Sequence, residues 1–346
     1  MTGAGTVATG ENATFAIDGS SQKDLNGRIV NHSGTAIWTG SGNILARDGA
    51  VFNNLAGAVF EAQNNQSYYW NFNGSVPVFN NAGMLRKTGG TGLSIFDASM
   101  THSGSLEALS GTIRLARSFT QSAGSTTMNG GNIETLPGMT INGGTLQGAG
   151  SITGNVTMNS GSAIPGNSAG VMSINGDYIQ GAGATLQFEI GGTTQGGQFD
   201  HLSIAGTATL GGALRISRIN DFVPSPSDTF EIITANSATG AFASITGTDA
   251  ANGNFFDPVY DAGNVMLVLK DGSPSISSMN FTYNAGQFSF QITGIAEQTY
   301  RVEGTQDFVT WTDIETRLTT ATTWDFVDPN PDKLTYRFYR TVFLPQ

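Results

Sequence analysis

The sequence contains no cysteine, few charged residues and no long hydrophobic run. The absence of cysteine excludes disulfides, thiol catalysis and cysteine-ligated metal sites. Charged residues make up 12% of the chain, roughly half of the usual share, and no stretch is rich in lysine or arginine. The chain therefore lacks the basic patch of nucleic-acid-binding proteins, and we predict no nucleic-acid partner. Because no run of about 18 apolar residues is present, we also predict no transmembrane segment.

The sequence shows neither the positive charge that would attract an anionic partner nor the pattern of an export signal. Its net charge of −11 favours solubility and on average repels anionic membranes and acidic polysaccharides. Residues 1–5 lead directly into strand-like sequence, without the charged and apolar regions of a signal peptide. We therefore expect a mature or trimmed form that carries an initiator methionine.

Glycine is the residue present in excess, with 47 copies, about twice its average usage. Disordered chains combine low hydrophobicity with high charge, whereas 38% of this chain is apolar and the apolar residues are regularly spaced. Short segments such as Thr112–Leu115 alternate with glycine, asparagine and serine, and no helical periodicity extends over three turns up to about residue 198. The predicted fold class is all-β.

A loose repeat runs along the first half of the chain. The segment Ile29–Gly34 recurs as Val51–Gly57 and as Val78–Gly83, with the central asparagines 22 and 27 residues apart. Each copy consists of a short apolar strand, an asparagine corner, a glycine and another strand. This spacing is typical of one coil of a β-solenoid. We expect the asparagines and glycines to bend the chain in left-handed backbone conformations.

Changes in the residue pattern along the chain predict that it is divided into three structural regions. Residues 1–198 are expected to form a right-handed parallel β-helix (solenoid), and residues 199–272 a closing β region that covers its last open edge. The stretch 97–177 has a single aromatic residue, Phe119, which indicates a narrow tube without room for rings. Residues 273–346 hold 13 of the 33 aromatics in period-two alternation, which predicts a small fibronectin-III/Ig-like β-sandwich.

Several motifs occur in the order found in a known class of exported proteins. They are Pro165–Gly170 with Asn175–Tyr178, then Leu186–Ile190, then Phe199–Leu202. Over roughly residues 100–270 the chain resembles exported bacterial β-helix proteins of the autotransporter-passenger type. The resemblance implies an extracellular or surface location and a structural or adhesive role, and it implies no reaction.

The tail carries a second resemblance. It is similar to the C-terminal β-sandwich modules of secreted planctomycete- and verrucomicrobia-type proteins in the segments Tyr300–Glu303, Asp307–Thr312 and Arg337–Arg340. These modules are extracellular or surface-attached, so the second resemblance implies the same location as the first.

Because parallel β-helices host polysaccharide lyases, we weigh the ionisable residues as a lyase site, which needs a base and cations on one face. The candidates are scattered over several predicted coils: Arg86, Lys87, Asp97, His102, Glu107, Arg114 and Arg117. We favour their interpretation as solvated side chains, and predict no catalytic residue and no enzyme. His32 and His102 share a His-Ser-Gly context that favours a corner role, and we predict no metal site and no cofactor. Asp200 and His201 are adjacent strand residues that face opposite ways, which argues against a catalytic dyad.

Three consecutive aromatic residues, Tyr68, Tyr69 and Trp70, are the candidate binding residues. They stand between two copies of the repeat, so at least one ring points outward, or the whole segment leaves the solenoid. An outward ring can stack on a sugar or contact another subunit. The other interpretation is a lateral loop folded onto its own solenoid.

The N-terminal segment contains the candidate self-association residues, Val7, Phe15 and Ile17. They lie in strand-like sequence that no amphipathic capping helix precedes. An open solenoid end either needs a cap or pairs with another chain. We therefore predict that this end contacts a second copy, head to tail.

Together these features predict a secreted or cell-surface bacterial protein with a structural or adhesive role, a subunit that self-associates into a fibre. Its predicted partners are copies of itself, neighbouring surface proteins or glycans. The alternative function is that of a surface polysaccharide-binding protein, or of a polysaccharide lyase on the same scaffold.

Overall fold

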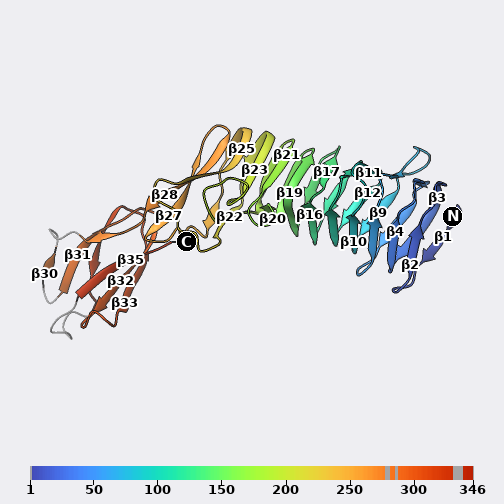
Figure 1. Cartoon of the computed structure of the whole chain (residues 1–346). Coiled ribbons are helices and arrows are strands. Elements are labelled where there is room, and N and C mark those ends of the chain that lie inside the picture. The colour runs from blue at the N-terminus through green and yellow to red at the C-terminus, as the bar shows by residue number, and fades with distance from the viewer. Residues whose placement is uncertain (1, 277–280, 285–286, 330–337, 346) are drawn as a thin grey trace. The chain divides into compact units, whose positions relative to one another are not determined.

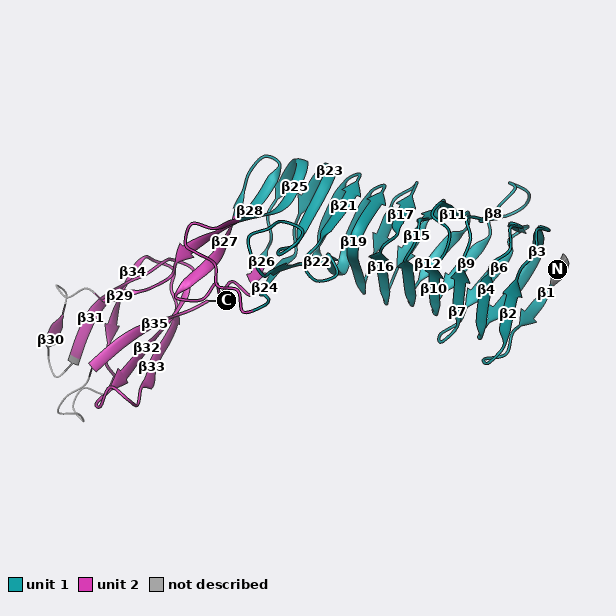
Figure 2. Ribbon diagram, viewed as in Figure 1, with its two compact units in different colours: residues 1–220, 230–244, 259–266 teal, residues 221–229, 245–258, 267–346 magenta. Residues whose placement is uncertain are grey.

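The computed structural model describes residues 2–276, 281–284, 287–329 and 338–345. Within these ranges the chain is all-β, as predicted, with no helix. It divides into two compact units (Figure 2): unit 1 comprises residues 1–220, 230–244 and 259–266, and unit 2 comprises residues 221–229, 245–258 and 267–346. The predicted division at residues 198 and 272 stays a prediction.

Unit 1 is built from three ladders of parallel strands, and each turn of the chain adds one strand to each ladder (Figure 1). The first ladder contains β1 (Thr2–Ala8), β3 (Lys23–His32), β6 (Val51–Asn54), β9 (Val78–Asn81), β12 (Ser99–His102), β15 (Phe119–Gln121), β18 (Met139–Ile141), β20 (Val156–Pro165) and β22 (Tyr178–Ile190). The second contains β2 (Thr14–Ile17), β4 (Thr35–Trp38), β7 (Val59–Ala62), β10 (Met84–Lys87), β13 (Ser105–Ala108), β16 (Ser125–Asn129), β19 (Thr145–Thr153), β20, β22 and β24 (Ala213–Arg218). The third contains β3, β5 (Ile44–Arg47), β8 (Ser67–Tyr69), β11 (Leu93–Phe96), β14 (Thr112–Leu115), β17 (Asn132–Thr135), β19, β21 (Val171–Asn175), β23 (His201–Leu210) and β25 (Thr229–Gly240). The strands β26 (Ser244–Thr246), β27 (Asn254–Tyr260) and β28 (Asn264–Asp271) follow along the chain.

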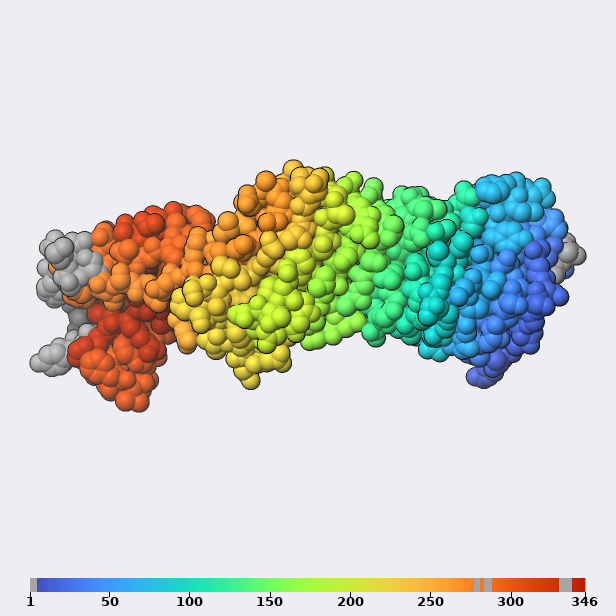
Figure 3. Space-filling model, turned by 45° about the horizontal axis from the view of Figure 1, so that its top comes forward, coloured from blue at the N-terminus to red at the C-terminus, as the bar shows by residue number. Residues whose placement is uncertain are grey.

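The turns stack in chain order, so successive colours follow one another along unit 1 in the space-filling view (Figure 3). Asn54 bonds to Asn81, its counterpart 27 positions later, whereas Gln147 bonds to Thr127, only 20 positions away in sequence. The longer early turns hold rings in their interior, all fully or almost fully buried: Trp38, Phe52, Phe60, Tyr68, Phe79 and Phe96. The shorter turns that follow hold mainly aliphatic side chains, as at Leu106, Ile133 and Leu146.

The repeated asparagines do not bend the chain, which corrects the role expected from the sequence. Asn54 and Asn81 are strand residues with ordinary backbone angles, and within the described ranges the asparagines with left-handed backbone are Asn220 and Asn252, outside the repeat. The repeat asparagines bond across turns instead. On the outer face Asn53 donates to Asn31 at 2.7 Å. The correction has a physical reason, since equivalent positions of stacked turns lie one sheet spacing apart and amides can then bond face to face.

An inward column of polar side chains runs beside this outer one. Asn54 donates to Asn81 Oδ1 at 2.7 Å, and Asn81 donates to His102 Nδ1 at 3.0 Å. His102 Nε2 lies 3.0 Å from the carbonyl oxygen of Ser125, an acceptor only, so Nε2 carries the proton. In the next turn Gln121 occupies the same column and donates to the carbonyl of Gly143 at 3.0 Å. The histidine is therefore a buried neutral member of the column and bonds across turns, as Asn54 and Asn81 do.

Acid is expected to weaken unit 1 through His102. Burial lowers the pKa of His102 below its ordinary value of about 6.5, so between the two pKa values the unfolded chain binds more protons than the folded one. The contribution of His102 to stability is complete above pH 6.5 and is lost as the pH falls toward the folded pKa. Urea unfolding at pH 7 and pH 5 should show a smaller acid-induced loss for His102→Gln than for the unchanged protein.

Because both proteins are measured at the same two pH values, the contributions of other titrating groups to stability cancel when the two losses are compared. Burial raises the pKa of Asp200 to about 7, so its contribution changes with the opposite sign, but it is the same in both proteins. Glutamine is the matched replacement because Gln121 already occupies this column. Equal pH dependence of the two proteins would contradict the assignment.

A column of glycines lines the corner between the first and second ladders. Gly104, Gly124 and Gly144 each lie where an added Cβ would overlap the carbonyl oxygen of the glycine one turn earlier. The same carbonyls accept the first N–H of the next strand, as where Ser125 N donates to Gly104 O at 2.8 Å. The turns stack this closely only because no side chain intervenes.

Unit 2 contains two small antiparallel sheets. One holds β29 (Ser275–Ile276), β30 (Thr282–Asn284), β31 (Gln287–Thr293) and β34 (Thr323–Val327), and the other holds β32 (Thr299–Thr305), β33 (Thr312–Leu318) and β35 (Phe338–Leu344). Phe290, Ile292 and Phe326 of the first sheet pack with Val302 of the second in one buried cluster. The aromatic residues of this part of the sequence thus join the two sheets through a shared core.

Candidate functional site

The structure separates the three consecutive aromatic residues. Tyr68 is fully buried, stacks on Phe96 with ring centroids 6.2 Å apart and meets Phe79 edge-on. Burial raises the pKa of the Tyr68 phenol well above its ordinary value. Because alternate residues of a strand face opposite ways, Tyr68 of β8 belongs to the core and Tyr69 reaches the surface. Trp70 follows the end of β8 and is also half-buried. Of the predicted binding residues, only Tyr69 and Trp70 reach the surface.

Tyr69 and Trp70 border a shallow depression of about 450 Å³ over the third ladder, which we call the Trp70 groove. The strands β8, β11 and β14 lie side by side beneath it, with Ile95 paired to Ser67 on one side and to Arg114 on the other. The Tyr69 hydroxyl donates to Gln22 Oε1 at 2.6 Å. Asp97 and Arg117 complete the wall next to Trp70. The groove therefore combines aromatic rings with fixed polar groups.

The charges of the groove occur in pairs. Arg117 Nε donates to Asp97 Oδ1 at 2.6 Å, and Arg114 Nε lies 2.9 Å from Glu134 Oε2. The Arg117 guanidinium also lies over the Trp70 ring, 5.0 Å from its centroid. Each arginine is thus neutralised by a carboxylate while its plane stays at the surface.

Phe72 does not line the groove itself but packs against Trp70, and we did not single it out from the sequence. Its side chain is 74% exposed, its ring centroid lies 4.9 Å from that of Trp70, and its backbone is left-handed with φ of 64°. Asn73, which follows it, accepts hydrogen bonds from the Trp70 indole at 3.1 Å and from the backbone of Asp48 at 3.2 Å. The signal in the sequence was Asn71-Phe72-Asn73-Gly74, because asparagine and glycine favour a turn whose tip exposes the residue between them.

The lyase candidates do not form one cluster. Asp97, Arg114 and Arg117 meet at the Trp70 groove. Arg86 pairs with Glu61, which also accepts from Thr88 at 2.8 Å, and lies beside Glu107 in the second ladder. The remaining two, Lys87 and His102, are buried in the interior, which corrects the expectation of solvated positions for them.

Lys87 is held inside the solenoid by carbonyl groups. Its Nζ donates to the backbone oxygen of Gly89 at 2.7 Å and to that of Asn64 at 2.5 Å. Burial lowers the pKa of its ammonium group. Three acceptors, with Asn65 Oδ1 at 3.2 Å as the third, satisfy this buried cation in place of a carboxylate.

Asp200 and His201 have separate partners; both side chains are buried, and Asp200 precedes β23, which begins at His201. Asp200 is buried and accepts backbone hydrogen bonds from Gly170 and Glu189, both at 2.8 Å. His201 Nδ1 lies 2.9 Å from the carbonyl of Glu231. The carboxylate therefore clamps the Pro165–Gly170 loop and does not orient the imidazole.

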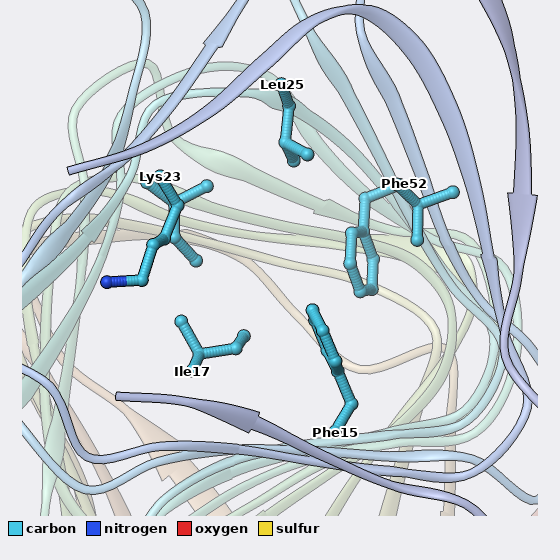
Figure 4. Close-up of a pocket in the computed structure, with 7 residues that line it drawn as sticks. Phe15, Ile17, Lys23, Leu25 and Phe52 are labelled. Atoms are coloured by element: carbon cyan, nitrogen blue, oxygen red, sulfur yellow. The ribbon is translucent and has the colours of Figure 1, made fainter. Parts of the chain in front are cut away.

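The first turn of unit 1 forms the second candidate site. Phe15 and Ile17 of β2 line a small apolar cavity of about 40 Å³ together with Leu25, Val30 and Phe52. Figure 4 shows the Phe15 and Phe52 rings facing the same space, with the Lys23 ammonium turned away from it.

The strands of this turn have open edges. Among the described residues β1 pairs with β3, and β2 with β4, and neither has a paired neighbour on its other side. Val7 lies in β1 opposite Val30 and is half-buried. The first turn thus presents unpaired strand edges around an apolar cavity.

Among the described residues, no three histidine or carboxylate groups are gathered in a way that would hold a metal ion. No helix among them has the length and apolar character needed to cross a membrane.

Comparison with known proteins places this chain in no family. No protein-family model matches it, and no curated protein is significantly similar to its sequence.

Proposed function

We propose that this chain is an extracellular structural or adhesive protein, a subunit of a bacterial surface or fibre that associates with copies of itself. Its scaffold is a right-handed parallel β-helix followed by a fibronectin-III/Ig-like β-sandwich. The three parallel ladders, with paired residues 17 to 31 positions apart, support the helix. The shared core of the two antiparallel sheets supports the sandwich. The extracellular location rests on the resemblance to exported bacterial β-helix proteins.

The observation that carries the proposal is the open first turn. Unpaired parallel strands present free N–H and C=O groups, which recruit a further strand. Phe15 is half-buried and supplies apolar surface at the same place, whereas Ile17 packs inward with 4% exposure. A second chain would therefore gain backbone hydrogen bonds and apolar burial against Phe15. A contact of this turn with a different surface of the next copy is heterologous, and repetition of such a contact gives an open filament.

The test is the size of the protein in solution. We expect light scattering and negative-stain microscopy of the 346-residue chain to show concentration-dependent oligomers or filaments. Phe15→Glu should remove them, because it places a charge at the apolar cavity, while far-UV circular dichroism stays unchanged. Val309→Glu is the matched control, since Val309 is 82% exposed in unit 2. Monomers at every concentration, or unimpaired assembly of Phe15→Glu, would refute the proposal.

A second function, glycan binding, is favoured by the Trp70 groove. Surface aromatic rings beside polar side chains are a common means of holding sugars, because the rings cover apolar sugar faces and the polar groups bond hydroxyls. Binding is favoured over cleavage because Asp97, the carboxylate that lines the groove, is already engaged by Arg117, and a general base must reach the proton that it abstracts.

A further inference from the structure

We propose that Trp70, Phe72 and Arg117 form the binding platform of the Trp70 groove and that its ligand is an uncharged glycan. The inference rests on the second proposed function and adds the ligand class and two residues, Phe72 and Arg117. It is independent of self-association through the first turn.

Phe72 is the strongest sign that the platform binds something. A bulky residue with φ of 64° is uncommon, and its ring is 74% exposed, so neither backbone preference nor burial explains its position. Such strain persists only where the surroundings enforce it. Here Asp48 N and the Trp70 indole both donate to the carbonyl of Asn73, and Gly49 N donates to Ser75 O at 2.9 Å. The loop is therefore fixed to the preceding turn, with its rings already in place.

Arg117 joins the rings to the polar wall of the groove. Its guanidinium lies 5.0 Å from the Trp70 centroid and 5.6 Å from the Phe72 centroid. Its Nε is occupied by Asp97 at 2.6 Å, which sets the orientation of the plane. A guanidinium carries four further N–H donors, and sugar hydroxyls are suitable acceptors for them. Little conformational entropy remains to be lost on binding, since the rings and the guanidinium hold one another.

The charge balance selects the ligand class. Arg117 is paired with Asp97 inside the groove, and Arg114 with Glu134 of the neighbouring strand β17, so each arginine of the groove has a carboxylate partner. The chain as a whole carries −11, which repels polyanions. A uronic-acid polymer would meet no unpaired cation, and a polycation no unpaired carboxylate. Hydroxyl-rich neutral chains match both the ring faces and the paired polar groups.

The test uses a glycan array that contains neutral and uronic oligosaccharides, followed by calorimetry of the purified chain with the best neutral oligosaccharide. We expect neutral glycans alone to bind. Phe72→Ala and Trp70→Ala should each weaken binding by roughly tenfold, the effect of losing one ring contact. Phe308→Ala is the matched control: Phe308 is 61% exposed and has φ of 59°, but lies in unit 2. It should leave the affinity unchanged.

Each of the other outcomes refutes a specific part of the proposal. Trp70-dependent binding of uronic glycans alone would refute the ligand class and leave glycan binding standing. Undiminished binding by both Phe72→Ala and Trp70→Ala would refute the platform. Binding of no glycan would refute this inference and the second function together. Loss of assembly in Phe72→Ala would identify the platform as a contact between copies and refute the inference, while the proposal of self-association would remain.

Discussion

Gly124→Ala is expected to destabilise unit 1 severely, and Gly57→Ala only moderately. Both glycines have left-handed backbone, with φ of 70° and 83°, so alanine costs about 1–2 kcal/mol at either position. They differ in their surroundings. A Cβ at Gly57 would meet nothing within 4 Å, whereas one at Gly124 would overlap the carbonyl oxygen of Gly104. We expect a total loss of about 4 kcal/mol or more for Gly124→Ala.

The measurement is equilibrium urea unfolding followed by circular dichroism, with hydrogen exchange of the turns next to residue 124. Because stacked repeats can open separately, hydrogen exchange shows whether the loss is confined to those turns. Gly57→Ala measures the cost of the backbone conformation alone. The difference in unfolding free energy between the two variants therefore measures the cost of the overlap between the added Cβ and the Gly104 carbonyl oxygen. Equal losses in the two variants would mean that the corner does not limit how closely the turns stack.

Phe79→Ala is expected to cost about 3–5 kcal/mol of unfolding free energy. Phe79 is fully buried in the centre of the ring stack. It lies parallel to Phe52 at 5.0 Å and meets Phe60 and Phe96 edge-on at 5.7 Å and 5.6 Å. Alanine would leave a cavity that the neighbouring turns cannot close, since their backbone ladders fix the spacing.

Urea unfolding of Phe79→Ala should be compared with that of Phe72→Ala. Both variants remove one ring from the same part of unit 1, but the Phe72 ring is 74% exposed, so its loss should change stability by only about 0.5 kcal/mol or less. A loss below about 1 kcal/mol for Phe79→Ala would show that the interior collapses around the gap.

The candidate sites were predictable from the sequence only in part. The run of three aromatics pointed to the groove, but not to which rings face it. Which rings face the groove depends on which residues of β8 point inward. The parallel pairing of β8 with β5 and β11 fixes this and turns Tyr68 inward. Phe72 was not singled out because its exposure follows from a loop held by Asp48, a residue of the preceding turn. Phe15 and Ile17 were predicted as end residues and do line the cavity of the first turn.

The sequence by itself determined that the chain is all-β, because period-two alternation and glycine-rich turns are local properties. It also contained the spacing of the repeat. Only the tertiary structure decided what the repeat residues do. Asn54, Asn81 and His102 bond across turns, and Gly104 and Gly124 meet at one corner. These contacts join residues about 20 to 27 positions apart, and such residues meet only after the turns have stacked in register.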